Sequence, residues 1–230
     1  GAVDFLMWVV TGISTGLTQG FSIQLSQYYG AKDFENLRKS LAHSYRLTAF
    51  IAAGVLILSQ SFASLVLTGL HTPSNIIGMS LLYLRIIFCG IPATAAYNMF
   101  ASALRAMGNS KTPLTAMIIA SVLNVSLDIL FVAGFGWGVA GAAIATVIAQ
   151  SFSAVYCFLI LRRIDIVHLT RADFMPASGM NARLMKLGIP VVFQNIIIGV
   201  GGLVVQYVIN GYGFLFVAGF TATNKLYGLL

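Results

Sequence analysis

Long apolar blocks separated by short polar breaks dominate the chain. A membrane-spanning helix needs about 20 consecutive, mainly apolar residues. The blocks that reach this length run over residues 2–29, 42–68, 79–105, 113–133, 138–161 and 187–210, and a further block begins near Phe214. None alternates strictly in the way that a membrane β-strand does. The pattern therefore predicts an all-α polytopic membrane protein with six transmembrane helices and the start of a seventh.

Composition supports this class and excludes others. Of 230 residues, 58% are hydrophobic and only 8% are charged, whereas soluble domains carry about 25% charged residues. A soluble enzyme, a disordered chain and a nucleic-acid-binding domain are therefore excluded. Cys89 and Cys157 lie inside apolar blocks without metal-type spacing, which predicts two buried free thiols. The chain begins and stops within apolar runs, so we expect an interior piece of a longer protein.

The basic residues set the orientation. They gather after the first, third and fifth blocks, whereas the loops around His71 and Trp137 contain no Lys or Arg. The positive-inside rule places the basic loops in the cytoplasm. The net charge of +7 is thus explained by topology, and no nucleic-acid partner is expected. The residues concerned are Lys32, Arg38, Lys39, Arg46, Arg105, Lys111, Arg162, Arg163, Arg171, Arg183 and Lys186.

Proline and glycine mark two further features within the blocks. Pro92 lies inside the third block and should kink that helix, because proline removes a backbone hydrogen bond. Gly12, Gly16 and Gly20 recur every four residues in the first block. This small-residue stripe predicts the close approach of another helix.

One acidic residue lies deep inside a block. Asp128 belongs to the fourth block, and a carboxylate near the bilayer centre costs about 2.5–3.5 kcal/mol. Asp4 lies near an outer helix end, where it can reach water. The other acids lie in cytoplasmic loops, where we expect solvated side chains: Asp33, Glu35, Asp165 and Asp173.

Asp128 has potential oxygen-bearing neighbours. Asn124 precedes it by four residues on the same helix face. Across the next turn, Thr146 lies at about the depth of Asn124, roughly 12 and 14 Å below the outer end. A carboxylate, an amide oxygen and a hydroxyl suit a small cation such as Na⁺. The same carboxylate could instead bind a proton, or the cluster could be a structural clasp between two helices.

Other polar residues are weaker candidates for a cavity or a substrate site. Tyr97 and Asn98 follow Pro92, while Gln194 and Asn195 lie in the inner half of the sixth block. Each could equally make an interhelical hydrogen bond. Gln150 carries less weight still.

No enzyme signature is present. Gly136, Gly138 and Gly141 match G-x-G-x-x-G, but no predicted strand precedes them and no acidic residue follows about 20 positions later. There is no P-loop, HExxH or Ser/His/Asp pattern. The sequence predicts no enzymatic activity and no organic cofactor.

Three stretches carry a family resemblance, namely GLTQGFSIQLSQYYGAKDFENLRKSL, ALRAMGNSKTPLTAMIIASVLNVSLDILFVAGFGWGVAGAAIATVIAQ and LGIPVVFQNIIIGVGGLVVQYVINGYG. With them the sequence resembles the multidrug and toxic compound extrusion (MATE) family of secondary transporters. The resemblance implies two six-helix lobes, of which the chain covers the second to the early eighth helix. Residues 1–161 would form the first lobe without its opening helix, 162–186 a cytoplasmic inter-lobe loop, and 187–230 the start of the second lobe.

The resemblance also implies roles for particular residues. Asn124, Asp128 and Thr146 match the cation site that some members carry in the first lobe. An aspartate on the family's first helix completes that site but is not part of this chain, and the glutamate that a subgroup carries on the seventh helix is absent here. The implied activity is antiport across the plasma membrane: cationic or amphipathic drugs or toxins leave in exchange for Na⁺ or H⁺. The lipid bilayer and the remainder of the transporter chain are the implied partners.

Two other functions stay open at this stage. A lipid-linked oligosaccharide flippase of the same superfamily would carry a basic cavity for a pyrophosphate, yet Arg85 is nearly the only basic residue inside the middle blocks. A non-transporting structural membrane protein would use Asn124, Asp128 and Thr146 only as a clasp between helices.

Overall fold

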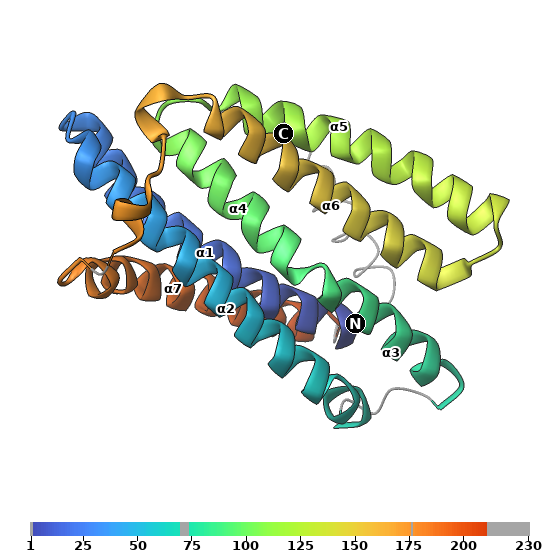
Figure 1. Cartoon of the computed structure of the whole chain (residues 1–230). Helices are drawn as coiled ribbons and strands as arrows, with labels where there is room; N and C mark the ends of the chain where they lie inside the picture. The colour runs from blue at the N-terminus through green and yellow to red at the C-terminus, as the bar shows by residue number, and fades with distance from the viewer. Residues whose placement is uncertain (1, 70–73, 176, 211–230) are drawn as a thin grey trace.

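The computed structural model describes residues 2–69, 74–175 and 177–210. The block expected near Phe214 lies outside these residues. Within them the chain is helical and contains no strand, as predicted. The elements are α1 (Ala2–Gly30), α2 (Phe34–Gly69), α3 (Ser74–Cys89), α4 (Ile91–Ala106), α5 (Lys111–Asp128), η1 (Ile129–Gly134), α6 (Gly138–Arg162), η2 (Asp165–Val167), η3 (Arg171–Phe174) and α7 (Met180–Asn210) (Figure 1).

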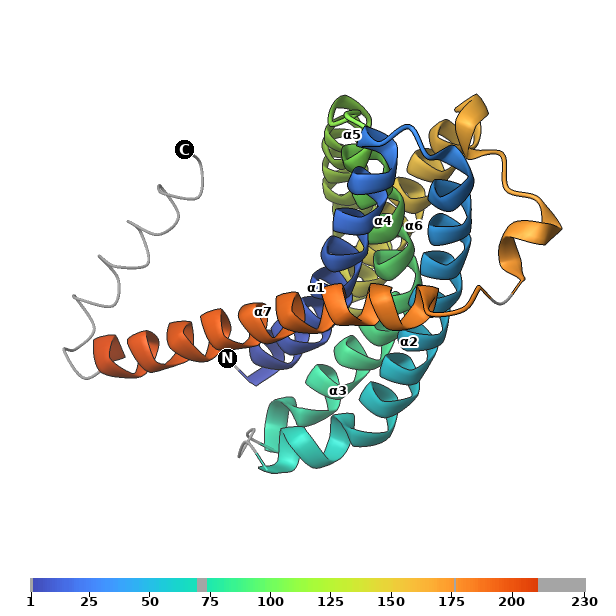
Figure 2. The same ribbon diagram turned by 90° about the vertical axis from the view of Figure 1, so that its left-hand side faces the viewer.

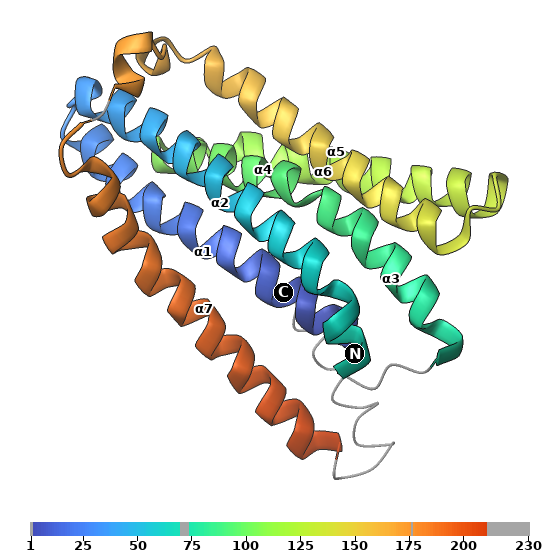
Figure 3. The same ribbon diagram turned by 60° about the horizontal axis from the view of Figure 1, so that its bottom comes forward.

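Helix α4 lies at the centre of the bundle and packs against α1, α2, α5 and α6. Helices α2 and α6 run on either side of it, and α5 and α6 form an antiparallel hairpin (Figures 1 and 3). Helix α7 packs along α1, and its C-terminal half extends beyond the other helices (Figure 2). The main core gathers buried side chains of α1, α2, α4 and α6, among them Phe21, Leu41, Met99 and Leu161.

Several helices are long and apolar enough to cross a membrane. They are Phe34–Leu65, Lys111–Gly134, Gly138–Arg162 and Met180–Gly202, and the bent pair Ile77–Cys89 with Ile91–Ala106 adds a fifth if it counts as one span. Helix α1 forms over the first predicted block but is not among them. The predicted multi-pass membrane architecture is confirmed.

The third predicted span is broken near Pro92, as expected. Its two halves, α3 and α4, meet at Gly90 with a bend of 42°. Pro92 lies in the first turn of α4, where its missing N–H removes no intrahelical bond. The break itself falls at Gly90, whose N–H donates to the carbonyl of Ile87 at 2.8 Å.

Two helices begin earlier than the apolar blocks suggested. Helix α2 starts at Phe34 because Asp33 caps it, accepting hydrogen bonds from the backbone N–H and the side-chain amide of Asn36 at 3.1 and 2.7 Å. Helix α7 starts at Met180, which shortens the connector expected over 162–186. Hydrophobicity alone misplaced both starts, since the first turns of both helices are polar.

The Asp33 cap predicts a dependence of stability on pH. The hydrogen bonds from the side chain and then the backbone of Asn36 lower the pKa of Asp33 below its ordinary value of 3.8. Its contribution to stability is therefore present above that value and is lost as pH falls through the lowered pKa. We expect the melting temperature in detergent to fall as the pH is lowered from 5 to 3. The fall should be smaller in an Asp33→Ala variant than in the unsubstituted protein. An equal loss in both proteins would contradict the role of the cap.

Helices α1 and α7 approach each other at the predicted glycine stripe. A Cβ atom at Gly20 would lie 2.3 Å from the Cα of Gly188, and one at Gly16 would lie 2.8 Å from the Cα of Val192. Gly12 has nothing within 4 Å. The prediction of close helix packing is confirmed at Gly16 and Gly20, and α7 is the helix that approaches.

The connector between α6 and α7 is tied to α2 by buried polar groups. His43 is 1% exposed, and its ring nitrogens lie 2.7 Å from Asn181 Oδ1 and 3.1 Å from the carbonyl oxygen of Met175. Asp173 is also buried, because its carboxylate accepts hydrogen bonds from the backbone and hydroxyl of Thr170 at 2.7 and 2.8 Å. The expectation that Asp173 is solvated was therefore wrong.

The cysteine expectation holds for one residue and fails for the other. Both thiols are free, and Cys157 is buried. Cys89 is exposed, since it ends α3 at the helix break, where its sulfur accepts a hydrogen bond from Gln60 at 3.4 Å.

Candidate cation site

A polar cavity of about 210 Å³ lies where α4, α5 and α6 meet. We call it the polar cavity. Its lining combines hydroxyl and amide side chains with small or apolar ones, and no charged side chain belongs to it. The lining residues are Tyr97, Met117, Ala120, Ser121, Asn124, Thr146, Ala149, Gln150 and Ser153.

Helical spacing explains which side chains face this cavity. Helix α5 contributes positions 117, 120, 121 and 124, and α6 contributes 146, 149, 150 and 153. Both sets follow the i, i+3, i+4, i+7 rule for one helix face. Gln150, which received little weight from the sequence, and Ser153, which received none, could have been found by extending the face that carries Thr146.

The structure brings Asn124 and Thr146 together. The Asn124 side-chain amide donates to Thr146 Oγ1 at 3.4 Å, and Thr146 Oγ1 donates to the carbonyl of Ala142 at 3.0 Å. The Asn124 amide nitrogen donates to Thr146, so Oδ1 is the atom of this side chain that can accept a hydrogen bond or bind a cation. This contact supports the predicted meeting of α5 and α6 at one depth.

Asp128 continues the same face of α5, one turn or about 6 Å beyond Asn124. It is the last residue of α5, and the chain continues from it as the π-helix η1. Its Oδ1 atom is buried and has no hydrogen-bond partner among the described residues. A buried carboxylate oxygen without a partner is costly, and π-helical segments occur frequently at functional sites.

A small cation or a proton would satisfy this oxygen. Asp128 does not line the polar cavity itself. It lies one turn beyond Asn124 on the same face of α5, next to the part of that face that lines the cavity. Hard oxygen donors of this kind suit Na⁺. In the part of the chain that the structure describes, no group of three or more His, Cys, Asp or Glu side chains is placed to hold a metal ion.

The other candidate residues separate into three groups. Tyr97 lines the polar cavity, and its hydroxyl lies 3.5 Å from the carbonyl of Pro113. Asn98 donates to Thr15 Oγ1 at 3.2 Å, and Asn195 donates to the carbonyl of Gly12 at 3.5 Å. Asn98 and Asn195 thus make interhelical hydrogen bonds with α1. Gln194 is exposed on α7.

Sequence comparison identifies curated relatives. The chain is 32% identical over 221 residues to the probable multidrug resistance protein YpnP of Bacillus subtilis, covering 96% of this chain and 49% of that protein. It is 24% identical to the multidrug export protein MepA of Staphylococcus saprophyticus, covering 95% and 49% respectively. The chain therefore spans about half the length of the curated relatives it matches.

The fold also matches solved transporter structures. A transporter of the MOP superfamily from Pyrococcus furiosus aligns with a TM-score of 0.89 at 23% identity, over 99% of this chain and 52% of that one. The family model MatE matches residues 1–130, which include Asn124 and Asp128. The matched proteins are named as a probable multidrug resistance protein, a multidrug export protein and a transporter, and none of these names describes an enzyme. The chain belongs to the MatE family, the multidrug and toxic compound extrusion transporters, as its sequence motifs had suggested.

Proposed function

We propose that the full-length protein is a plasma-membrane antiporter that exports cationic or amphipathic compounds in exchange for Na⁺ or H⁺. The observation that carries this proposal is the buried, unpartnered Oδ1 of Asp128 at the junction of α5 and the π-helix. The names of the relatives support export of drugs, since they include a multidrug export protein.

In this proposal the ionised carboxylate of Asp128 binds the coupling ion. Asn124 Oδ1 and a lone pair of Thr146 Oγ1 contribute further oxygen atoms from the neighbouring turn of α5 and from α6. A bound ion shifts a conformational equilibrium only if it binds one state more tightly. The ion would therefore favour the arrangement in which the oxygens of α5 and α6 converge, and this would reshape the polar cavity between them.

The two alternative functions receive less support from the described residues. A flippase cavity for a pyrophosphate needs basic side chains, but none lines the polar cavity, and Arg85 lies on an exposed position of α3. A purely structural clasp would satisfy Asp128 with hydrogen bonds, whereas its Oδ1 has none within the described part of the chain.

The test uses the full-length parent in inverted membrane vesicles with a fluorescent cationic dye. We expect dye accumulation under an imposed Na⁺ gradient or an imposed proton gradient, and collapse of the effective gradient by an ionophore should stop it. The effective gradient identifies the coupling ion. Vesicles without the protein provide the control. No movement of dye under either gradient would contradict the proposal, and lipid-linked substrates would then be tested.

A further inference from the structure

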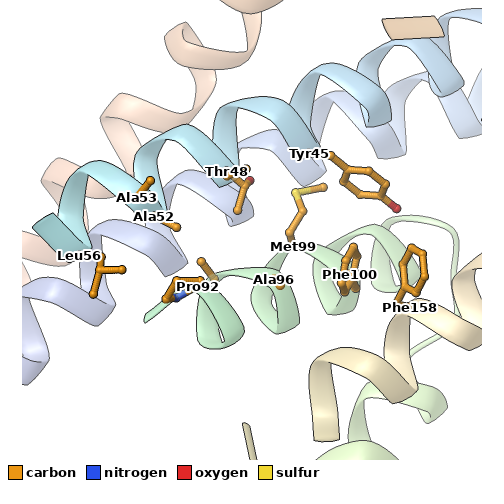
Figure 4. A pocket seen from close by; sticks show the side chains of 12 residues that line it. Tyr45, Thr48, Ala52, Ala53, Leu56, Pro92, Ala96, Met99, Phe100 and Phe158 are labelled. Atoms are coloured by element: carbon orange, nitrogen blue, oxygen red, sulfur yellow. The ribbon is translucent and has the colours of Figure 1, made fainter. Parts of the chain in front are cut away.

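A second hollow of about 350 Å³ lies on the opposite side of α4 from α5. We call it the apolar groove. Helix α4 forms its floor, α2 forms one wall, and Phe158 of α6 closes one end (Figure 4). Its lining contains no charged side chain. The residues are Tyr45, Thr48, Ala49, Ala52, Ala53, Leu56, Pro92, Ala95, Ala96, Met99, Phe100 and Phe158.

The apolar groove adjoins a third hollow of about 310 Å³ at the cytoplasmic end of α6. Tyr45 and Phe158 line both spaces, so the two lie side by side. We call this third space the basic hollow because Arg162 and His168 line it. Each volume lies at the lower end of the range of ligand pockets, about 300–1,000 Å³.

Aromatic side chains stand where the two spaces join. The rings of Tyr45 and Phe100 pack edge to face with centroids 5.4 Å apart, and Phe100 and Phe158 lie 5.2 Å apart. Tyrosine, such as Tyr45 here, is typical of the level at which a membrane protein passes from hydrocarbon to headgroups. The apolar groove thus extends toward the bilayer core, and the basic hollow lies at the cytoplasmic surface.

Polar groups without partners occur in both spaces. Thr48 is 8% exposed, lines the apolar groove, and its buried Oγ1 has no hydrogen-bond partner among the described residues. Arg162 makes no hydrogen bond or ion pair within the same residues. His168 is already 3.8 Å from the carboxylate of Asp165, so Arg162 is the cation available to a ligand.

We propose that the apolar groove and the basic hollow together bind one anionic phospholipid of the cytoplasmic leaflet. An acyl chain occupies the groove along α4, the Thr48 hydroxyl donates to an ester carbonyl, and the phosphodiester pairs with Arg162. Basic pockets between membrane helices on the cytoplasmic side bind such headgroups, and an arginine presents several donors to phosphate. No acidic side chain lines either space, which disfavours a cationic substrate.

Lipid can reach the groove from the surface around it. Ala49 and Ala53 of α2 line the groove and are exposed. Apolar side chains exposed on a multi-pass membrane protein face acyl chains or another part of the protein. The competing occupant is a helix of the parent protein outside this chain, and the experiment distinguishes the two.

The experiment measures lipid retention by native mass spectrometry of the full-length parent, released from vesicles of equal phosphatidylglycerol and phosphatidylcholine. We expect Arg162→Gln to lower phosphatidylglycerol retention about fivefold, as the loss of one basic contact at a membrane surface implies, without changing phosphatidylcholine. Arg163→Gln is the matched control, because Arg163 is the exposed neighbour that lines neither space. Inorganic phosphate added in excess should not displace the lipid.

A second variant tests the groove independently of charge. Ala96→Phe fills the space above α4, and we expect it to lower the retention of both lipids. A lower melting temperature in Ala96→Phe with unchanged lipid retention would assign the groove to a protein helix and overturn the proposal. The proposal would also be overturned if Arg162→Gln and Arg163→Gln lowered phosphatidylglycerol retention equally, or if neither lowered it. Displacement of the lipid by inorganic phosphate would overturn it as well.

Discussion

A single methyl group added at Gly20 is expected to separate α1 from α7. In a Gly20→Ala variant the new Cβ would lie 2.3 Å from the Cα of Gly188 and 2.7 Å from the carbonyl oxygen of Leu187. These are backbone atoms, so no side chain can turn aside to make room. Overpacking typically costs about 1–3 kcal/mol and occasionally more, and we expect about 3 kcal/mol or more here.

The glycine stripe supplies its own controls. Gly12→Ala lies on the same face of α1 with nothing within 4 Å, so its melting temperature in detergent should match that of the parent. Gly188→Ala would meet the side-chain ends of Leu17 and Phe21 at 3.0 and 3.1 Å, which can shift, and its loss should be intermediate. If Gly20→Ala melts at the same temperature as Gly12→Ala, the close contact of α1 with α7 is contradicted.

The second large effect is expected at Asp128. An Asp128→Asn substitution removes the negative charge but keeps the shape of the side chain, so packing should change little. A hydrogen bond or contact to a charged group contributes about 1.5–3 kcal/mol, which corresponds to a loss of roughly tenfold or more. We therefore expect gradient-driven dye accumulation by the full-length parent to fall at least about tenfold, while expression and melting temperature are retained.

A matched acid-to-amide change tests whether this effect is specific. Glu35 lies at the start of α2, exposed and paired with Lys39 at 2.6 Å. Glu35→Gln should leave transport unchanged. Transport at the parental rate in Asp128→Asn would remove Asp128 from the coupling mechanism. If Asp128→Asn lowered the yield and melting temperature enough to explain the lost transport, Asp128 would instead belong to a structural clasp between helices.

Local features of the sequence predicted most of the helices. In a membrane every backbone polar group must be satisfied within the helix, so an apolar run of sufficient length specifies a helix without regard to its neighbours. The proline predicted a break in the third span, but the structure places the break at Gly90, and Pro92 in the first turn of α4 removes no intrahelical bond. The spacing of Asn124 and Asp128, and the hairpin that returns the chain to Thr146, were likewise local and sufficient to anticipate the Asn124–Thr146 contact.

The starts of helices with polar first turns, and the buried polar groups of the connector, were predicted less well. The start of α2 is marked by the cap at Asp33, and the carboxylate of Asp173 is satisfied by its bonds to Thr170. Both follow from hydrogen-bond geometry over a few residues rather than from hydrophobicity. The π-helical turn after Asp128 had no signal in the apolar pattern, because an apolar run does not distinguish one helical geometry from another.

The sequence by itself determined the class of protein, the family and the isolated acid at position 128. Only the tertiary structure decided that Gly16 and Gly20 of α1 meet Val192 and Gly188 of α7, and that Gln150 and Ser153 share a cavity with Asn124. It also decided that Tyr45 and Phe158 line both the apolar groove and the basic hollow. Helix formation depends on neighbours within about one turn. Cavities and contacts depend on which helices lie side by side, and these are set by packing between segments that are distant in the chain.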